Sequence, residues 1–233
     1  MILPSFANQT DKSSCDIISV QQELPEQTRE HNSEESCFVF GSNLFVEGRI
    51  GHKVLNTLKT YDDIKGISLH SPGGSTSVAI EIGKLVREKE LITWMRPQAV
   101  CASSCTLVFQ AGARRYAGPD SLLFYHCVGM GPFARMVLEQ SCGPDIESYD
   151  AQCSQDLNDF IEITTQSTKE YMAENHLKYG MSQEFYDYFF SEKAFDDRWF
   201  EKANFCQRKL ALGSEDALRF NIVQEIKANY LQE

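Results

Sequence analysis

Two adjacent serines, Ser103 and Ser104, lie between two cysteines in the segment AVCASSCTLVFQAG, which spans residues 99–112. The residues that follow are apolar enough to form a buried helix. A serine at the N-terminal end of such a helix can be its cap, because the side-chain oxygen accepts backbone N–H groups. It can also be a nucleophile for acyl transfer, since neighbouring N–H groups and the helix dipole stabilise developing negative charge.

A second segment of interest is the glycine loop HSPGGS, residues 70–75. Two glycines after a proline let the backbone turn sharply and leave N–H groups available to bind an oxyanion. The alternative is an ordinary turn from strand to helix, closed by a serine or threonine cap. In an α/β sheet, loops that follow the C-terminal ends of strands are where active sites form.

A serine nucleophile needs a general base, usually histidine or lysine. The sequence has no lysine between Lys89 and Lys169, which disfavours a lysine dyad built from nearby residues. His126 ends the next expected strand, and His70, directly before the glycine loop, is the second candidate. A lone histidine is more often structural. The order of glycine loop, serine and histidine at successive strand ends is what favours catalysis.

The elements around these residues alternate between strand and helix. Residues 37–50 show β-type residues interrupted by glycine, and residues 52–61 have apolar side chains at helical spacing. After them we expect strand 64–70, helix 76–90, strand 91–95, helix 103–113, a turn over RRYAGPDS at 114–121, and strand 122–129. This rhythm predicts a parallel sheet with right-handed crossovers.

The two ends of the chain differ from this core. Residues 8–36 are polar and predict a mobile arm with a short strand at DIISV. From about residue 145 the sequence predicts a helical part: a long acidic helix ended by Gly180, an aromatic-rich helix at 182–191 and a last helix at 206–213. We therefore expect a polar arm over 1–36 and one α/β domain over 37–233.

Composition and charge limit the class of protein. The chain has 233 residues, 42% of them hydrophobic and 24% charged, as in a globular protein. Its net charge of −11 disfavours nucleic acid and anionic membrane surfaces as partners, because both require a positive field. No apolar run approaches the roughly 20 residues of a membrane span.

The eight cysteines permit disulfides in an oxidising compartment, although free cysteine is also a good core residue. Cys15 and Cys37 could tether the arm. Cys101 and Cys105 bracket Ser103, where a disulfide and two small buried thiols are equally compatible with the spacing, and Cys127 is a further possible partner. There is no CxxC pair, so we expect no metal site.

The first residues bear on localisation. Ser5-Phe6-Ala7 has small residues at both ends, as before a signal-peptidase cut. It is either the remnant of an export signal over 1–7 or a chance match. Together with the cysteines it favours a periplasmic or secreted protein.

These motifs resemble those of a known family. LHSPGGSTSVAIEIGKLV, CASSC and AGARRYAGPDSLLFYH look like the proteolytic subunit of the Clp protease, and more closely like exported ClpP-like proteins of the ClpP/crotonase superfamily. The similarity covers roughly residues 38–129 well and the remainder weakly. It implies an α/β core of repeated β-β-α and βαβ units with a C-terminal helical part, a peptide or protein substrate, no cofactor, and a homo-oligomer. An ATPase partner is not implied.

The resemblance also implies roles for individual residues. The nucleophile falls on Ser103 and the base on His126, while the Ser104 backbone N–H completes an oxyanion hole with Gly73 and Gly74. The acidic third residue falls near SEKAFDDRWF, where the nearest match is Lys193 and Asp196 is the expected acid.

Three functions are compatible with the sequence. The first is a serine hydrolase, in particular a peptidase. The second is a non-catalytic ClpP-like binding or assembly protein in which Ser103 is only a cap. The third is a crotonase-type enzyme for acyl-thioesters, which is disfavoured because nothing indicates a basic adenine-nucleotide pocket and such enzymes need no serine–histidine pair.

Overall fold

The computed structural model describes residues 13–19, 21–27, 34–126, 162–163, 165–191 and 209–228. The chain divides into two compact units. Unit 1 comprises Met1–Leu123 with Gly213–Glu233, and unit 2 comprises Phe124–Leu212. No helix in the described ranges is long and apolar enough to cross a membrane.

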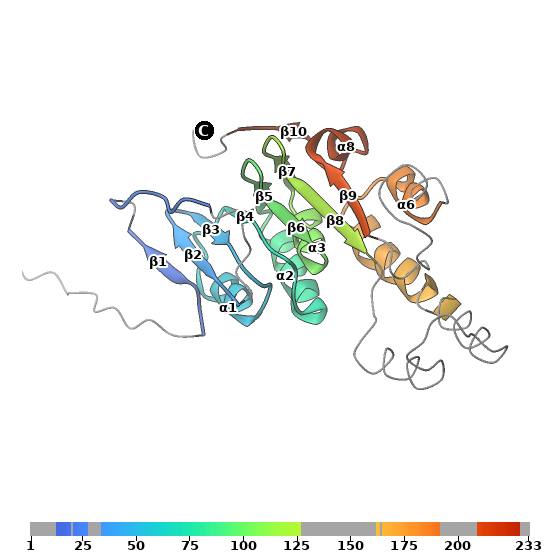
Figure 1. Cartoon of the computed structure of the whole chain (residues 1–233). Helices are drawn as coiled ribbons and strands as arrows, with labels where there is room; N and C mark the ends of the chain where they lie inside the picture. Colours follow the sequence, from blue (N-terminus) through green and yellow to red (C-terminus); the bar gives the residue numbers. More distant parts are fainter. Residues whose placement is uncertain are drawn as a thin grey trace, which may run out of the picture. The chain divides into compact units, whose positions relative to one another are not determined.

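Unit 1 is built on a seven-stranded sheet in the order β1-β2-β3-β4-β5-β7-β10 (Figure 1). Only β2 and β3 run antiparallel, across a tight turn in which Gly41 has a φ of 60°. All other neighbouring strands are parallel, so the expected mixed α/β fold is confirmed. The strands are β1 (Asp16–Ile18), β2 (Cys37–Phe40), β3 (Asn43–Val46), β4 (Gly66–Leu69), β5 (Ile92–Met95), β7 (Arg114–Ala117) and β10 (Glu225–Ile226).

Helices α1 (His52–Thr60), α2 (Thr76–Glu88) and α3 (Ser104–Gln110) pack side by side in unit 1 (Figure 1). Their apolar residues recur at helical spacing, and α3 is buried over its whole length, as the sequence predicts. Helix α8 (Ser214–Arg219) precedes β10. The short strand β6 (Val100–Ala102), which the sequence did not reveal, leads directly into Ser103.

The segment RRYAGPDS was expected to be a turn, and this prediction is wrong for its first half, whereas a turn is present at 119–120. Its first four residues form β7, which lies between β5 and β10. Arg115 is buried there because backbone carbonyls satisfy its guanidinium: Nε donates to Ile222 at 2.6 Å and Nη1 donates to Gly112 at 3.1 Å. One of these acceptors comes from the far end of the chain, which sequence inspection could not anticipate.

The described part of the N-terminal arm packs on unit 1 and does not form the mobile arm expected from its polar sequence. Strand β1 pairs with β2, and a disulfide joins Cys15 to Cys37. The Cys15 N–H donates to Thr57 Oγ1 at 2.8 Å. Ile18 and Leu24 pack against a buried aromatic cluster formed by Phe38, Phe45, Trp94 and Tyr116.

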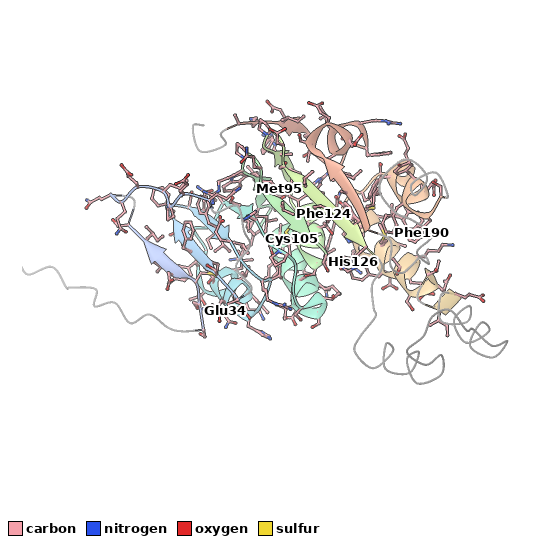
Figure 2. All side chains as sticks on the ribbon, viewed as in Figure 1. Glu34, Met95, Cys105, Phe124, His126 and Phe190 are labelled. Atoms are coloured by element: carbon pink, nitrogen blue, oxygen red, sulfur yellow. A yellow bond between two sulfur atoms is a disulfide. The ribbon has the colours of Figure 1, made fainter. Side chains whose placement is uncertain are left out.

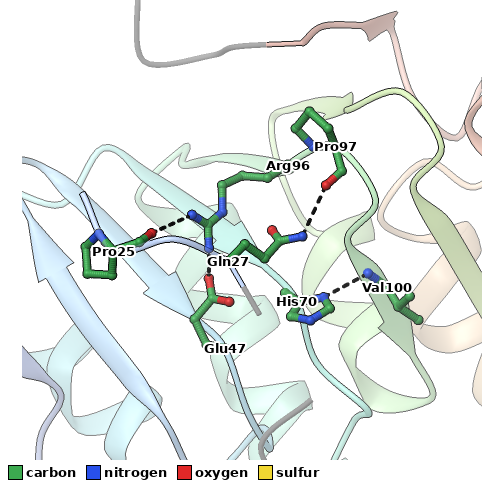
Figure 3. A network of polar contacts seen from close by, with 7 residues as sticks. All are labelled: Pro25, Gln27, Glu47, His70, Arg96, Pro97 and Val100. Atoms are coloured by element: carbon green, nitrogen blue, oxygen red, sulfur yellow. Dashed lines mark hydrogen bonds and ion pairs between the residues drawn. The ribbon is translucent and has the colours of Figure 1, made fainter. Parts of the chain in front are cut away.

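A partly buried ion pair extends this attachment (Figure 3). Arg96 pairs with Glu47 and also donates to the Pro25 carbonyl at 3.1 Å, while Gln27 Nε2 donates to the Pro97 carbonyl at 3.1 Å. Burial raises the pKa of Glu47, although the Arg96 charge and hydrogen bond oppose this shift. Removing Arg96 would leave the partly buried Glu47 carboxylate without its counter-ion. Because Arg96 also binds the Pro25 carbonyl, one polar network holds the arm to the sheet.

Unit 2 contains β8 from Phe124 onward, β9 up to Leu212, a π-helix and helix α6. Strand β8 (Leu122–His126) is adjacent to β9 (Lys209–Gly213). The expected aromatic-rich helix is α6 (Gln183–Phe190), and the acidic helical segment ends in a π-helix over Met172–Leu177 before Gly180. The helix expected at 206–213 is wrong for its described part, because Leu210 and Leu212 alternate as buried residues of β9.

The contact between Cys15 and Thr57 can be tested with a matched pair of variants. Thr57→Val removes the acceptor of a buried N–H, and we expect the free energy of unfolding to fall by about 1–3 kcal/mol in urea titrations with the disulfides intact. Thr60→Val is the control. Both threonine hydroxyls donate to the carbonyl four residues earlier, Thr57 at 2.8 Å and Thr60 at 2.7 Å, but Thr60 is exposed. Equal losses in the two variants would contradict a stabilising role for this contact.

Candidate functional site

Ser103 occupies a sharp turn between β6 and α3. Its φ is 56° and its ψ is −129°, a conformation that residues other than glycine rarely adopt and that costs on the order of 1–3 kcal/mol. Its carbonyl oxygen accepts two hydrogen bonds from Thr106, one from the N–H at 2.9 Å and one from Oγ1 at 2.7 Å. Its own side chain forms no capping bond to α3. The interpretation of Ser103 as a helix cap is therefore wrong.

The glycine loop follows β4 and lies beside this turn. The Ser71 N–H donates to the Val100 carbonyl at 2.8 Å, and the Ala102 N–H donates to the Ser71 carbonyl at 2.9 Å. This parallel bridge fixes the end of β4 against β6. The loop then ends at Ser75, which caps α2 by accepting the Val78 N–H.

Gly73 lies close to the turn that contains Ser103. Its φ is 97°, and a Cβ built there would lie 2.7 Å from Ser103 Cβ and 3.2 Å from the Ser104 backbone nitrogen. The first distance is too short for a real Cβ atom and the φ is one that side chains rarely adopt, so the position requires glycine. The structure thus brings together three of the expected site residues, Gly73, Ser103 and Ser104.

Gly74 is held on the other side of the loop by Ile50. The Ile50 N–H donates to the Gly73 carbonyl at 2.9 Å, and the Ser75 N–H donates to the Ile50 carbonyl at 3.1 Å. A Cβ on Gly74 would lie 2.1 Å from the Ile50 oxygen. Gly74 is therefore required for packing, and its role as an oxyanion donor stays a prediction.

The expected oxyanion donors differ in their present contacts. The Gly73 N–H donates to Ser71 Oγ at 3.1 Å, so in this structure it is engaged within the loop. Ser104 is buried, and its hydroxyl makes no hydrogen bond with the described part of the chain. Its expected contribution is the backbone N–H alone, which stands close to Gly73.

His70, the second candidate base, has a structural contact. It is fully buried, and its Nδ1 accepts the Val100 N–H at 3.0 Å (Figure 3). Because Nδ1 is an acceptor, the neutral ring carries its proton on Nε2. The ring thereby joins the end of β4 to the start of β6 and supports the turn that contains Ser103.

His126 is exposed at the C-terminal end of β8 (Figure 2). It belongs to unit 2, whereas Ser103 belongs to unit 1. The pairing of these two side chains stays a prediction. The expected acid, Asp196, and its neighbour Lys193 lie outside the described residues.

A disulfide brackets the turn that contains Ser103. Cys101 in β6 is bonded to Cys105 in α3, and their Cα atoms are 5.3 Å apart. Both residues are fully buried. This decides between the two possibilities that the spacing left open. In the described part of the chain, no cluster of histidine, cysteine and acidic residues could hold a metal ion.

Sequence reasoning missed two contributors to the site, Thr106 and Ser71. Thr106 holds the Ser103 carbonyl, and Ser71 both pairs with β6 and accepts the Gly73 N–H. A threonine three residues after a turn and a serine two residues before a glycine are common patterns for such local bonds. Neither was distinctive enough to be singled out.

The comparisons with known proteins concern the fold. No protein-family model matches the chain, and no curated protein matches it. Solved structures similar to it include a serine-to-alanine mutant of the 1510-N membrane-bound stomatin-specific protease, at 14% identity over 82% of this chain and 79% of that chain, with a TM-score of 0.46. Another is an asparagine-to-aspartate mutant of ClpP1 from Listeria monocytogenes, at 16% identity over 81% of this chain and 92% of that chain, with a TM-score of 0.48. Both likenesses concern the fold alone and assign no role to any side chain.

Unit 2 contains a buried titratable group of its own. His176 lies in the π-helix, with its ring 5.8 Å from the Tyr125 ring and 5.6 Å from the Tyr171 ring. Burial lowers the pKa of His176 to about 3. Burial is the larger cause that raises the pKa of Tyr171, and the electrostatic effect of the nearby Tyr179 raises it further. Both groups are therefore neutral at pH 7, and His176 acts as part of an aromatic core with Phe185 and Phe189.

The fit of Gly73 against Ser103 predicts a difference between two glycines. Gly73→Ala is expected to lower the free energy of unfolding by about 1–3 kcal/mol, because the new Cβ meets backbone and must adopt a positive φ. Gly213→Ala is the control: no atom lies within 4 Å of its ideal Cβ, and its φ is −70°. Its expected cost is below about 1 kcal/mol. Chemical denaturation of both variants measures the difference, and a tolerated Gly73→Ala would refute the close approach.

The neutral state of His176 predicts acid sensitivity. Its pKa is lower in the folded chain than its ordinary value of 6.5, so the stability it contributes is complete above that value and is lost as the pH falls toward about 3. Over this range the unfolding free energy should fall by up to about 1.4 kcal/mol per pH unit from this group.

His176→Phe should flatten the acid limb of stability measured by circular dichroism, because the variant cannot bind this proton. His52→Gln, at the exposed start of α1, should leave the limb unchanged. An identical pH dependence of wild type and His176→Phe would show that the buried histidine does not drive acid unfolding.

Proposed function

We propose that the chain is a serine hydrolase that cleaves peptides, with Ser103 as its nucleophile. The observation that carries this proposal is the backbone of Ser103, which has a positive φ in a turn pressed against the glycine loop. Strained backbone of this kind clusters at active sites, where the surrounding structure over-determines it. The Ser103 hydroxyl is not consumed as a helix cap, which leaves it available for chemistry.

The proposed mechanism has two halves. His126 takes the proton of Ser103 as the hydroxyl oxygen attacks a peptide carbonyl, and the protonated histidine then gives that proton to the leaving amine. A water deprotonated by the same histidine hydrolyses the acyl-enzyme and restores Ser103. Asp196 is proposed to orient the imidazole.

Backbone N–H groups of Ser104 and of the Gly73–Gly74 loop are proposed to bind the oxyanion. The short distance between the Ser104 nitrogen and Gly73 supports a shared site for these donors. For the Gly73 N–H to take part, it must exchange Ser71 Oγ for the substrate oxygen. This exchange replaces one hydrogen bond by another to a charged acceptor, which is the stronger type.

We further propose that the protein works outside the reducing cytoplasm and as a homo-oligomer. The two disulfides, Cys15–Cys37 and Cys101–Cys105, support an oxidising compartment, because such bonds are rare among cytosolic proteins. The homo-oligomer and the peptide or protein substrate follow from the sequence resemblance. No ATPase partner is part of the proposal.

One observation favours a second function, that of a non-catalytic binding or assembly protein. The Gly73 N–H, an expected oxyanion donor, is bonded to Ser71 Oγ. If this bond is permanent, the loop is a structural turn and Ser103 has no oxyanion site beside it. The two functions differ in the reactivity of Ser103.

A fluorophosphonate probe tests this reactivity. An activated serine displaces fluoride from phosphorus and keeps the probe covalently, so the wild-type chain should become labelled and Ser103→Ala should not. His126→Ala should label at least roughly 100-fold more slowly, because the general base is lost. Ser77→Ala, at an exposed serine in α2, should label like the wild type.

Ser104→Ala locates the nucleophile. This variant keeps the backbone N–H and should retain labelling, whereas loss of labelling in Ser104→Ala alone would move the nucleophile by one residue. Absence of labelling in a folded wild-type chain would contradict the hydrolase and favour the non-catalytic function.

A further inference from the structure

The disulfide between Cys101 and Cys105 spans the strained residue of the site. Cys101 precedes Ser103 by two residues and Cys105 follows it by two, so the bond closes a short loop around the serine. Cys101 belongs to β6. Cys105, labelled in Figure 2, belongs to the first turn of α3. The bond therefore joins the two elements whose directions define the turn.

The hydrogen bonds of Ser71 and of Thr106 each hold only one side of the Ser103 turn. On the β6 side, Ser71 fixes the strand through its bonds to Val100 and Ala102. On the α3 side, both Thr106 bonds end on the Ser103 carbonyl and move with the helix. Neither set ties β6 to α3 across Ser103. A covalent link does so, and it is the kind of restraint that a positive φ needs in order to persist.

We infer that the Cys101–Cys105 disulfide is a positioning element for Ser103, so that the reactivity of this serine depends on the redox state of the pair. The inference rests on the proposed hydrolase function. With the disulfide intact, Ser103 keeps its positive φ and its place against Gly73. With the disulfide broken, the start of α3 shifts and Ser103 relaxes toward an ordinary backbone conformation.

The redox step is a thiol–disulfide exchange with a dithiol reductant. One thiolate of the reductant attacks a sulfur of the pair, the sulfur–sulfur bond breaks and a mixed disulfide forms. The second thiol of the reductant displaces the remaining cysteine, which leaves two protein thiols and an oxidised, cyclic reductant. Both cysteines are fully buried, so the attack requires local opening of the turn.

Loss of the bond should not unfold unit 1. The far end of α3 has its own anchor, because Thr93 Oγ1 in β5 donates to the Phe109 carbonyl at 2.7 Å. The body of α3 is also buried against its neighbours. The relaxation is therefore expected to stay within the turn, where it alters the nucleophile and spares the fold.

The chain offers a matched control in its second disulfide. Cys15 and Cys37 are also buried, at 5% and 6% exposure, and their bond also lies in unit 1. It joins the segment before β1 to β2 and contains no residue of the nucleophile turn. A general effect of losing a disulfide should appear in both pairs, whereas a positioning effect should appear only at Cys101–Cys105.

The test compares Cys101→Ala/Cys105→Ala and Cys15→Ala/Cys37→Ala with the wild type in fluorophosphonate labelling at several probe concentrations. In the first double variant we expect the maximal labelling rate to fall by about 10–100-fold while the probe concentration at half-maximal rate stays the same. In the second we expect both values to stay within about twofold of the wild type. Melting curves confirm that each variant is folded at the assay temperature.

Hydrogen exchange over residues 99–106 provides a readout independent of activity. The first double variant and the wild type reduced with dithiothreitol should exchange faster over this segment, whereas the second double variant should not. Equal labelling and equal exchange in wild type and the first double variant would overturn the inference. If the wild type is unlabelled, the hydrolase proposal fails, and faster exchange without the bond would retain only its conformational part.

Discussion

The close approach of the glycine loop to Ser103 is the constraint on which the rest of the candidate site depends. It requires a glycine with positive φ at position 73 and an unusual backbone at position 103, and it leaves room for neither residue to move alone. The parallel bridge between Ser71 and β6 sets the spacing, and the buried His70 ring reinforces it by accepting the Val100 N–H. These contacts come from strand ends of the same unit, which explains why a rigid sheet is needed to hold a short turn.

The free-energy cost of the Ser103 conformation is comparable with the contribution of each restraint around it. The conformation of Ser103 costs on the order of 1–3 kcal/mol. A disulfide that closes a very short loop is expected to contribute about 2 kcal/mol by restricting the unfolded chain. The two Thr106 hydrogen bonds add about 0.5–1.5 kcal/mol each. The cost of the Ser103 conformation is thus of the same order as each restraint, which is why we expect the loss of one restraint to change the conformation of the serine while the surrounding unit remains folded.

Local patterns in the sequence were sufficient for much of this architecture. Helix α2 has clear apolar periodicity and a serine cap, and β4 and β5 are short apolar runs next to turn residues. The same rules failed where distant residues decide the structure. The pair Arg114–Arg115 looks like a polar turn, yet Arg115 is buried in β7 because the chain end supplies an acceptor at Ile222. Residues 209–213 follow basic residues and resemble a helix end, but Leu210 and Leu212 alternate as in a strand.

The site itself divides in the same way. The motifs were sufficient to predict that Ser103 lies at the start of a buried helix and that the glycine loop joins a strand to a helix, because both are local structures with local signatures. The disulfide between Cys101 and Cys105 could not be chosen over two free thiols, since its formation depends on how β6 enters α3 and not on spacing alone. Once that entry angle is known, the positions of the cysteines acquire a physical reason. They lie on the two sides of Ser103, whose φ is positive, so the covalent bond restrains the turn where hydrogen bonds to the neighbouring elements do not reach.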